Sequence, residues 1–368
     1  MKILLLGDYS GLHDTLGRAL VARGHDVTVA SDGCGFLRLR GAYSLRRILP
    51  GRAGGALLYA RMRWGAPLRG YDVVQIISPI FAQLRPHRLR VIFDCLMRDN
   101  GPVFLTAAGT DKAMMDYYLS PGCRLRYTEF TCTDGSPNHR TDDYLAENRL
   151  WQQGELGEYC EYVYDHIAGA ATPLYEYHLG MAARLGDRRT VYTGLPVELP
   201  PETYTAAHDG PLRIMLGRDR HRMAWKGTDR LEAAVTDAIR RAPGRAALDI
   251  VENLPYTDYL RRLDATDLLI DQLYSYTPAL NALLAMVRGK AVVSGGEDDF
   301  YRFIGEDTLR PIFNPVPDDT ALVALFDDIL AHPESVRAAA AQAREFVVRH
   351  NAADTVAQRY EQMWNALC

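Results

Sequence analysis

Two stretches of the chain begin in the same way. KILLLG at residues 2–7 and LRIMLG at residues 212–217 are unbroken apolar runs that end in glycine, and a loop, a helical pattern and another apolar run follow each. An apolar run without alternation is typical of a strand buried on both faces, and strands that are joined through helices lie parallel. The repeated pattern predicts an α/β protein of two doubly wound lobes with a cleft between them. A length of 368 residues fits two domains of roughly 150–200 residues each.

The order of the elements follows from periodicity and from turn residues. In the first lobe we expect a helix over residues 12–23 and further strands over 26–31, 73–77 and 103–108. Residues 128–157 are polar and aperiodic, which predicts an irregular insertion or lid. Gly194, Pro196, Pro200 and Pro201 cluster in TVYTGLPVELPPETY, so we place the boundary between the lobes near residue 195. In the second lobe, helices and strands alternate up to Pro317, and the remainder is helical.

Composition excludes several classes of protein. The net charge of −4 and the absence of a nucleic-acid motif argue against a nucleic-acid partner. The six cysteines are scattered without close pairs, which predicts reduced thiols and neither a disulfide framework nor a metal site. MKILLLGDY has an apolar run too short for a signal peptide, and no run approaches the roughly 18 residues of a membrane-spanning helix. We therefore expect a cytoplasmic protein.

Residues 33–71 contain no Asp or Glu but many arginines interspersed with apolar residues. The arginines are Arg38, Arg40, Arg46, Arg47, Arg52, Arg61, Arg63 and Arg69. One interpretation is a surface that contacts anionic lipid, at the inner face of the membrane. The alternative is an arginine-rich solvated face whose apolar side covers the N-terminal sheet.

Several motifs resemble the GT-B glycosyltransferases of the retaining family-four type. They are the opening strand and glycine loop with RGHDVTVAS, Gly194-Leu195-Pro196, GRDRHRMAWKGTDRLEAAV, DLLIDQL, GKAVVSGG and the terminal REFVVRHNAADTVAQRYEQMW. They occur in the family's order over nearly the whole chain, and the resemblance implies two Rossmann-like, doubly wound lobes that face each other across a cleft. The resemblance implies an acceptor domain at 1–195, a nucleotide-sugar domain at 196–350, and a terminal helix at 351–368 that crosses back to the first domain.

The resemblance also implies a reaction. A sugar passes from a UDP- or GDP-type nucleotide sugar to a glycan or lipid-linked acceptor, which implies a role in surface polysaccharide biosynthesis. The resemblance implies no cofactor and no essential metal. A departing diphosphate gains negative charge, so the reaction needs fixed positive charge. Lys226 and Arg218 follow the first strand of the second lobe, at the edge where ligands bind open α/β sheets, and coincide with the family's phosphate-binding cations. Lys226 is one of only four lysines among 42 basic residues; a solvated loop position is the alternative for both.

The stretch SYTPALNALLAMVRGKAVVSGG, residues 275–296, predicts a buried helix and then a strand. Thr277 suits the N-cap, Pro278 the first helical position and Gly289 the stop, and a helix N-terminus attracts phosphate. Together with neighbouring loops, this segment supplies the predicted donor-binding residues, namely Gly217, Gly227, Glu252, Tyr256, Tyr274, Tyr276, Thr277, Pro278, Ala279 and Leu280.

This stretch contains no carboxylate, although the family has two glutamates there. Aligning AM-x-x-GKAVV with the family places Tyr276 and Leu284 at those positions. Neither side chain replaces a charged acceptor, whose loss costs roughly 1.5–3 kcal/mol. Three alternatives stay open: an unusual donor, a catalytically impaired protein that keeps the fold, or substitution by nearby groups, for which the candidates are Glu252, Asp271, Tyr274, Asn281 and Glu297.

On the acceptor side, the glycine loop after the first strand supplies the candidates Gly7, Asp8, Tyr9, Ser10, Gly11 and His13. For His13, a structural role at the start of a helix is the alternative. After the strand at 103–108, Ala108 occupies the position of a family histidine, and Asp111 remains as a catalytic candidate or as a helix cap. Two functions therefore compete: a retaining glycosyltransferase, and a GT-B homologue that binds a sugar, a nucleotide or a partner without catalysis.

Overall fold

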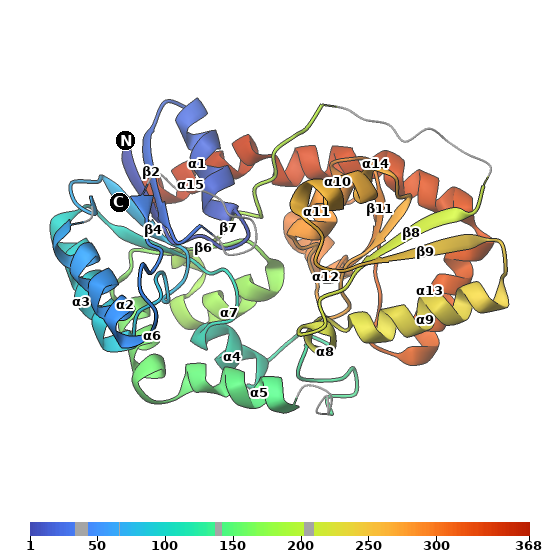
Figure 1. The fold of residues 1–368 in the computed structure, drawn as a ribbon, viewed down its shortest axis with the longest axis horizontal. Coiled ribbons are helices and arrows are strands. Elements are labelled where there is room, and N and C mark those ends of the chain that lie inside the picture. The colour runs from blue at the N-terminus through green and yellow to red at the C-terminus, as the bar shows by residue number, and fades with distance from the viewer. Residues whose placement is uncertain (34–42, 66, 137–141, 202–209) are drawn as a thin grey trace.

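Two parallel β-sheets organise the chain into an N-terminal and a C-terminal lobe, which lie side by side in the computed structural model (Figure 1). The structure describes residues 1–33, 43–65, 67–136, 142–201 and 210–368. All strand pairs within each sheet are parallel, as the unbroken apolar runs and intervening helices predict. The predicted α/β architecture of two doubly wound lobes is confirmed.

The N-terminal sheet has the order β3-β2-β1-β4-β5-β6-β7. Its strands are β1 (Lys2–Leu6), β2 (Asp26–Ser31), β3 (Tyr43–Ser44), β4 (Val73–Ile76), β5 (Val103–Thr106), β6 (Ala170–Thr172) and β7 (Thr190–Tyr192). The connecting helices are α1 (Leu12–Ala22), α2 (Gly51–Ala60), η2 (Arg61–Gly65), α3 (Pro86–Asp99), α4 (Lys112–Tyr118), α5 (Asp142–Asn148), η4 (Arg149–Gln152), α6 (Gly154–His166), α7 (Tyr175–Leu185) and η5 (Asp187–Arg189).

The C-terminal sheet has the order β12-β11-β10-β8-β9. Its strands are β8 (Leu212–Gly217), β9 (Ala246–Val251), β10 (Leu268–Ile270), β11 (Ala291–Val293) and β12 (Ile312–Phe313). Its helices are α8 (Met223–Lys226), α9 (Thr228–Arg241), α10 (Tyr256–Asp264), α11 (Leu280–Met286), α12 (Asp298–Ile304), α13 (Asp319–Ala331) and α14 (Pro333–Asn351).

Each sheet is covered on both faces, which is why its strands are apolar throughout. In the N-terminal lobe, α3 and α6 pack on one face, and α1 and the last helix, α15 (Ala353–Leu367), pack on the other. In the C-terminal lobe, α9 and α13 cover one face, and α11 and α14 cover the other. The four apolar layers hold the carboxyl ends of both sets of strands in fixed positions.

The chain passes between the lobes twice. The first passage follows β7, and the second is at Ala352, where extended backbone separates α14 in the C-terminal lobe from α15 in the N-terminal lobe (Figure 1). The two passages touch, because the Val197 amide donates to the Asn351 carbonyl and the Ala353 amide donates to the Val197 carbonyl. The crossing helix α15 therefore becomes part of the core of the N-terminal lobe.

The polar segment 128–157 differs from the prediction of an irregular insertion. It contains α5, η4 and the start of α6, although residues 137–141 lie outside the described part. Trp151 and Leu145 are partly buried against a small cluster around Met115 and Phe130, so sparse apolar contacts hold these short helices without a clear periodic pattern. None of the helices over the described residues combines the length and apolar composition that a membrane crossing requires.

Replacing Trp364 with alanine tests whether α15 is integral to the first lobe. The indole is fully buried and donates from Nε1 to the Gln75 side chain, 2.9 Å away. The substitution leaves a cavity in place of the indole and leaves the side-chain oxygen of Gln75 without its donor. Together these changes should lower the free energy of unfolding, measured by urea denaturation, by about 3–5 kcal/mol. Trp64→Ala is the matched control, because Trp64 is exposed and its loss should cost under about 0.5 kcal/mol. Equal effects of the two substitutions would contradict this packing.

Candidate functional site

Polar residues gather at the carboxyl edge of the C-terminal sheet, where open α/β folds bind ligands. Arg218, Glu252, Asp271 and Ser294 directly follow β8, β9, β10 and β11. Because these strands are parallel, the four residues meet at one edge. Lys226 joins them from the end of α8.

Lys226 points toward this edge. Its Nζ lies 3.7 Å from Oδ1 of Asp271, and the lysine side chain is 27% exposed while the aspartate is buried. Asp271 also accepts hydrogen bonds from Asn281 Nδ2 at 3.2 Å and from Ser294 Oγ at 3.3 Å. The Asp271 carboxylate thus holds the Lys226 ammonium in place, while the ammonium remains accessible to solvent. A cation that binds a diphosphate needs both properties.

Gly227 allows the lysine loop to lie close to the strand ends. Its φ is +67°, and a Cβ there would lie 2.7 Å from Cβ of Leu273. The Leu273 amide also donates to the carbonyl of Lys226 at 2.8 Å. A larger residue at position 227 would therefore push Lys226 away from the sheet edge.

Arg218 and Glu252, both predicted to contact the donor, contact each other. Nε of Arg218 donates to Glu252, and Nη1 donates to Glu232 at 2.9 Å. Arg220 donates to Glu252 as well, and the hydrogen bonds from Arg220 and Arg218 lower the pKa of that carboxyl group. Two carboxylates thus compensate the charge of Arg218, which leaves Lys226 as the better-placed cation for a phosphate.

The helix after β10 starts later than predicted. α11 begins at Leu280 with Ala279 as its N-cap, so the assignment of Thr277 as N-cap and Pro278 as first helical residue is wrong. The reason is that Thr277 Oγ1 is engaged by the N-terminal lobe: it donates to Glu176 at 2.7 Å and accepts from the Tyr175 amide at 2.9 Å. The segment ahead of α11 is buried against the other lobe.

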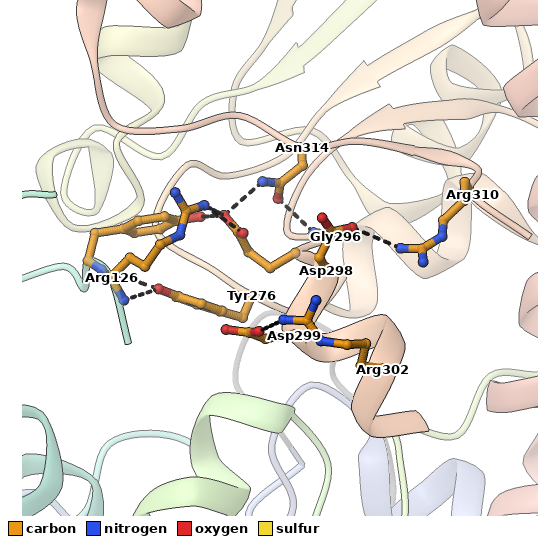
Figure 2. Close-up of polar contacts among 10 residues, drawn as sticks. Arg126, Tyr276, Gly296, Asp298, Asp299, Arg302, Arg310 and Asn314 are labelled. Atoms are coloured by element: carbon orange, nitrogen blue, oxygen red, sulfur yellow. Dashed lines mark hydrogen bonds and ion pairs between the residues drawn. The ribbon is translucent and has the colours of Figure 1, made fainter. Parts of the chain in front are cut away.

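Tyr276, which the sequence resemblance aligns with the first of two glutamates, joins the lobes. Its hydroxyl accepts from the amides of Arg126 at 2.5 Å and Tyr127 at 3.2 Å, and its ring lies 5.0 Å from the Tyr127 ring (Figure 2). Leu284, at the second position, is half-buried among the apolar residues around α11 and α14. Neither position presents an acceptor to a ribose or a sugar.

Glu297 supplies one carboxylate close to Tyr276. This buried group accepts from Arg126 Nη2 at 2.7 Å, from the Tyr127 hydroxyl at 2.7 Å and from Asn314 Nδ2 at 2.8 Å (Figure 2). We refer to Arg126, Tyr127, Tyr276, Glu297 and Asn314 as the interlobe cluster. Within this cluster, the Glu297 carboxylate is engaged in hydrogen bonds between the lobes.

Glu176, at the start of α7, supplies a second carboxylate from the N-terminal lobe. It accepts from Ser275 Oγ at 2.9 Å, from the Tyr276 amide at 3.3 Å and from Thr277 Oγ1. Burial raises the pKa of Glu176. The sequence does not identify Glu176, Arg126 or Tyr127, because their partners are far away in the chain and no local pattern marks them.

Glu129 is a third buried carboxylate at the contact between the lobes. It accepts from Nε1 of Trp225 at 3.4 Å, next to Lys226, and burial raises its pKa to about 7. The carboxyl group is therefore about half protonated near neutral pH. No local sequence pattern marks Glu129, since it lies in the aperiodic segment 128–157.

The N-terminal sheet presents its glycine loop at its own carboxyl edge. Gly7, Ser10 and Gly11 all have positive φ, which shapes the turn into α1. Asp8 is buried, with Oδ1 accepting from the His13 amide at 3.0 Å and Oδ2 without a hydrogen-bond partner among the described residues. Burial raises the pKa of Asp8 to about 6. Asp8 is thus the acceptor-side candidate with spare hydrogen-bonding capacity.

His13 and Asp111 take the structural roles that the sequence leaves open. The ring nitrogens of His13 contact the Gly7 carbonyl at 2.7 Å and Thr106 Oγ1 at 3.2 Å, and burial lowers its pKa to about 4. Oδ1 of Asp111 accepts from the Met114 amide at 2.9 Å, which caps α4. Both side chains are buried, and neighbouring protein groups account for these contacts without a ligand.

The remaining predicted residues are spread over both lobes. Tyr256 is exposed at the start of α10, and the Tyr274 hydroxyl accepts from Arg230 at 3.3 Å. Tyr9 donates to the Ile80 carbonyl at 3.2 Å in the N-terminal lobe. Within the part of the chain that the structure describes, no group of three His, Cys, Asp or Glu side chains is arranged to hold a metal ion.

Tyr276→Phe tests the interlobe cluster. The substitution leaves the amides of Arg126 and Tyr127 without their acceptor, which should cost about 1–3 kcal/mol of stability. Hydrogen exchange at these two amides should accelerate accordingly. Tyr256→Phe, at an exposed position, should leave exchange at both amides unchanged. Unaltered exchange in Tyr276→Phe would contradict the contact.

Glu129→Gln tests the buried carboxyl group. A folded-state pKa of about 7, against 4.5 for the ordinary side chain, means that the folded protein retains a proton that the unfolded chain releases. This contribution lowers wild-type stability as pH rises from about 4.5 to 7. Relative to wild type, Glu129→Gln should therefore gain up to about 3 kcal/mol between pH 5 and pH 8 in urea denaturation. Glu158→Gln, at an exposed site, should follow wild type at every pH.

Comparison with known proteins places this arrangement in a known fold. No protein-family model and no curated protein matches the sequence. Among solved structures, sucrose-phosphate synthase from Thermosynechococcus elongatus is 14% identical, with a TM-score of 0.59 over 100% of this chain and 99% of that one. Anabaena HepE in complex with UDP and glucose is 14% identical, with a TM-score of 0.60 over 100% of both chains.

A third structure shows how far the likeness extends. UDP-GlcNAc 2-epimerase from Neisseria meningitidis, bound to UDP-GlcNAc, is 8% identical with a TM-score of 0.54 over 99% of this chain and 100% of that one. At these identities the likeness concerns the fold, which transferases and epimerases share. The likeness to the first two structures covers the whole of this chain, and the chain has the GT-B fold.

Proposed function

We propose that the protein transfers a sugar from a nucleotide-sugar donor to an acceptor hydroxyl. The observation that carries the proposal is Lys226, a partly exposed ammonium at the carboxyl edge of the C-terminal sheet in a full-length GT-B fold. In the reaction, the bond from the sugar carbon to the diphosphate oxygen breaks, a bond to the acceptor oxygen forms, and the proton of the acceptor hydroxyl passes to the leaving diphosphate. Lys226 would stabilise the charge that the leaving diphosphate gains.

The proposed arrangement divides the two substrates between the lobes. The donor lies against the C-terminal lobe at 196–350, and the acceptor lies near the glycine loop of the N-terminal lobe at 1–195. The sequence motifs favour a retaining, metal-independent enzyme that acts on a glycan or lipid-linked acceptor in surface polysaccharide synthesis at the cytoplasmic side. Nucleotide-sugar complexes of fold neighbours such as HepE support the choice of donor class.

A second candidate function is a binding protein without catalysis. Tyr276 favours it, because this residue stands where the family has a glutamate and its hydroxyl is used in the interlobe cluster. Glu176 and Glu297 are likewise engaged in contacts between the lobes. Such a protein would bind a nucleotide or a partner protein but would leave nucleotide sugars intact.

Titration calorimetry with UDP and GDP, followed by a panel of their sugars, separates the candidates. Lys226→Ala should weaken nucleotide binding by roughly tenfold to a hundredfold, the loss of one charge-assisted contact, and should abolish transfer. Lys2→Ala is the control, since the Lys2 ammonium lies over the Tyr71 ring in the N-terminal lobe, 4.9 Å from its centroid.

Each outcome has one meaning. Transfer or hydrolysis by wild type that Lys226→Ala abolishes supports the enzyme. Nucleotide binding without turnover of any sugar nucleotide supports the binding protein. Interconversion of two UDP-sugars without an acceptor would identify an epimerase. No binding of either nucleotide would overturn both the transferase and the nucleotide-binding protein, and would leave only a protein that binds a partner.

A further inference from the structure

The segment between β3 and α3 leaves large apolar side chains in solvent. Trp64 and Ile48, at 70% and 68% exposure, are the most exposed large apolar residues in the described part of the chain. Leu49 and Leu57 are exposed as well. This exposure is not a failure to form a core, because Leu58 and Met62, on the other side of α2 and η2, are buried in the N-terminal lobe.

Arginines accompany these apolar residues, and acids do not. Arg46 and Arg52 are exposed, and the Arg63 guanidinium lies 5.8 Å from the centroid of the Trp64 ring. Among the described residues, no carboxylate forms an ion pair with any of these three arginines. We call Arg46, Ile48, Leu49, Arg52, Leu57, Arg63 and Trp64 the arginine–tryptophan surface.

The other arginines of the segment have structural roles. Arg47 donates to the Gln83 carbonyl, Arg61 donates to the carbonyls of Arg46 and Ser44, and Arg69 pairs with Asp99. Arg38 and Arg40 lie outside the described residues. The three arginines of the surface are thus distinguished by their contacts and not by composition alone.

We propose that the arginine–tryptophan surface docks the protein on an anionic lipid bilayer. A bilayer interface accepts tryptophan and aliphatic side chains at the level of the headgroups, while arginines contact lipid phosphates. The whole chain carries a net charge of −4, so the attraction must come from this acid-free region. The aliphatic residues Ile48, Leu49 and Leu57 offer no stacking or hydrogen bonding to a nucleic acid, which favours lipid as the partner.

The surface lies next to the carboxyl edge of the N-terminal sheet. The loop that carries Ile48 directly follows β3, and Arg47 ties it to Gln83, in the segment after β4. In the same segment, the Ile80 carbonyl accepts from Tyr9 of the glycine loop. If the proposed transfer function holds, this placement brings the acceptor side of the protein to the membrane, as a lipid-linked acceptor would require.

Sedimentation with lipid vesicles tests the proposal on the full-length protein. Wild type should bind vesicles of phosphatidylcholine mixed with phosphatidylglycerol, should not bind phosphatidylcholine alone, and should dissociate at high salt. Arg46→Gln, Arg52→Gln and Arg63→Gln should each weaken partitioning about fivefold, the factor equivalent to ~1 kcal/mol per cation. Trp64→Ala should weaken binding even where all arginines remain.

Matched controls separate docking from general surface effects. Leu150→Ala removes an exposed apolar side chain of the same lobe, and Arg240→Gln removes an exposed arginine from α9. Both should bind vesicles like wild type, and thermal melting should confirm that all variants fold. Because the assay contains no nucleotide sugar, its result is independent of the transfer experiment.

Three results would overturn the proposal. They are the absence of binding to anionic vesicles, equal binding to neutral vesicles, and equal losses in the control variants. Retention of RNA or of an acidic protein by this surface, without vesicle binding, would assign it to that other partner.

Discussion

The rest of the structure depends on the hydrogen bonds that buried carboxylates accept at the contact between the lobes. Glu297 accepts from Arg126, Tyr127 and Asn314, and Glu176 accepts from the segment ahead of α11. Removing a carboxylate from water is costly unless several donors satisfy it. Here each carboxylate has at least three donors, so the contact sets a specific relative position of the two sheets.

This contact determines which polar groups remain for a ligand. Tyr276 and Thr277 direct their hydroxyl groups to the N-terminal lobe, and Arg218 lies between two glutamates. Lys226 keeps access to solvent beside Asp271, whereas Asp8 keeps an unsatisfied oxygen on the other sheet. The chemistry that the fold can support is therefore concentrated at the two opposed sheet edges, and the space ahead of α11 belongs to the lobe contact.

The tyrosine at position 276 acquires a physical explanation from these contacts. A carboxylate at position 276 would lie close to Glu297 and Glu176, both already buried, and like charges in such surroundings destabilise each other. A tyrosine there instead accepts two backbone amides and packs on Tyr127. The side chain at position 276 thus joins the lobes, and a carboxylate there would oppose the contact.

The sequence by itself determined the two parallel sheets and the helices between them, because burial on both faces imposes unbroken apolar strands such as residues 2–6 and 212–217. It also indicated Lys226, which follows a strand end and therefore must lie at the sheet edge. Only the tertiary structure decided that Thr277 does not cap α11 and that Glu176, Glu129 and Arg126 face the other lobe. The reason is that strand and helix patterns are local, whereas the partners of these buried polar groups come from segments far apart in the chain.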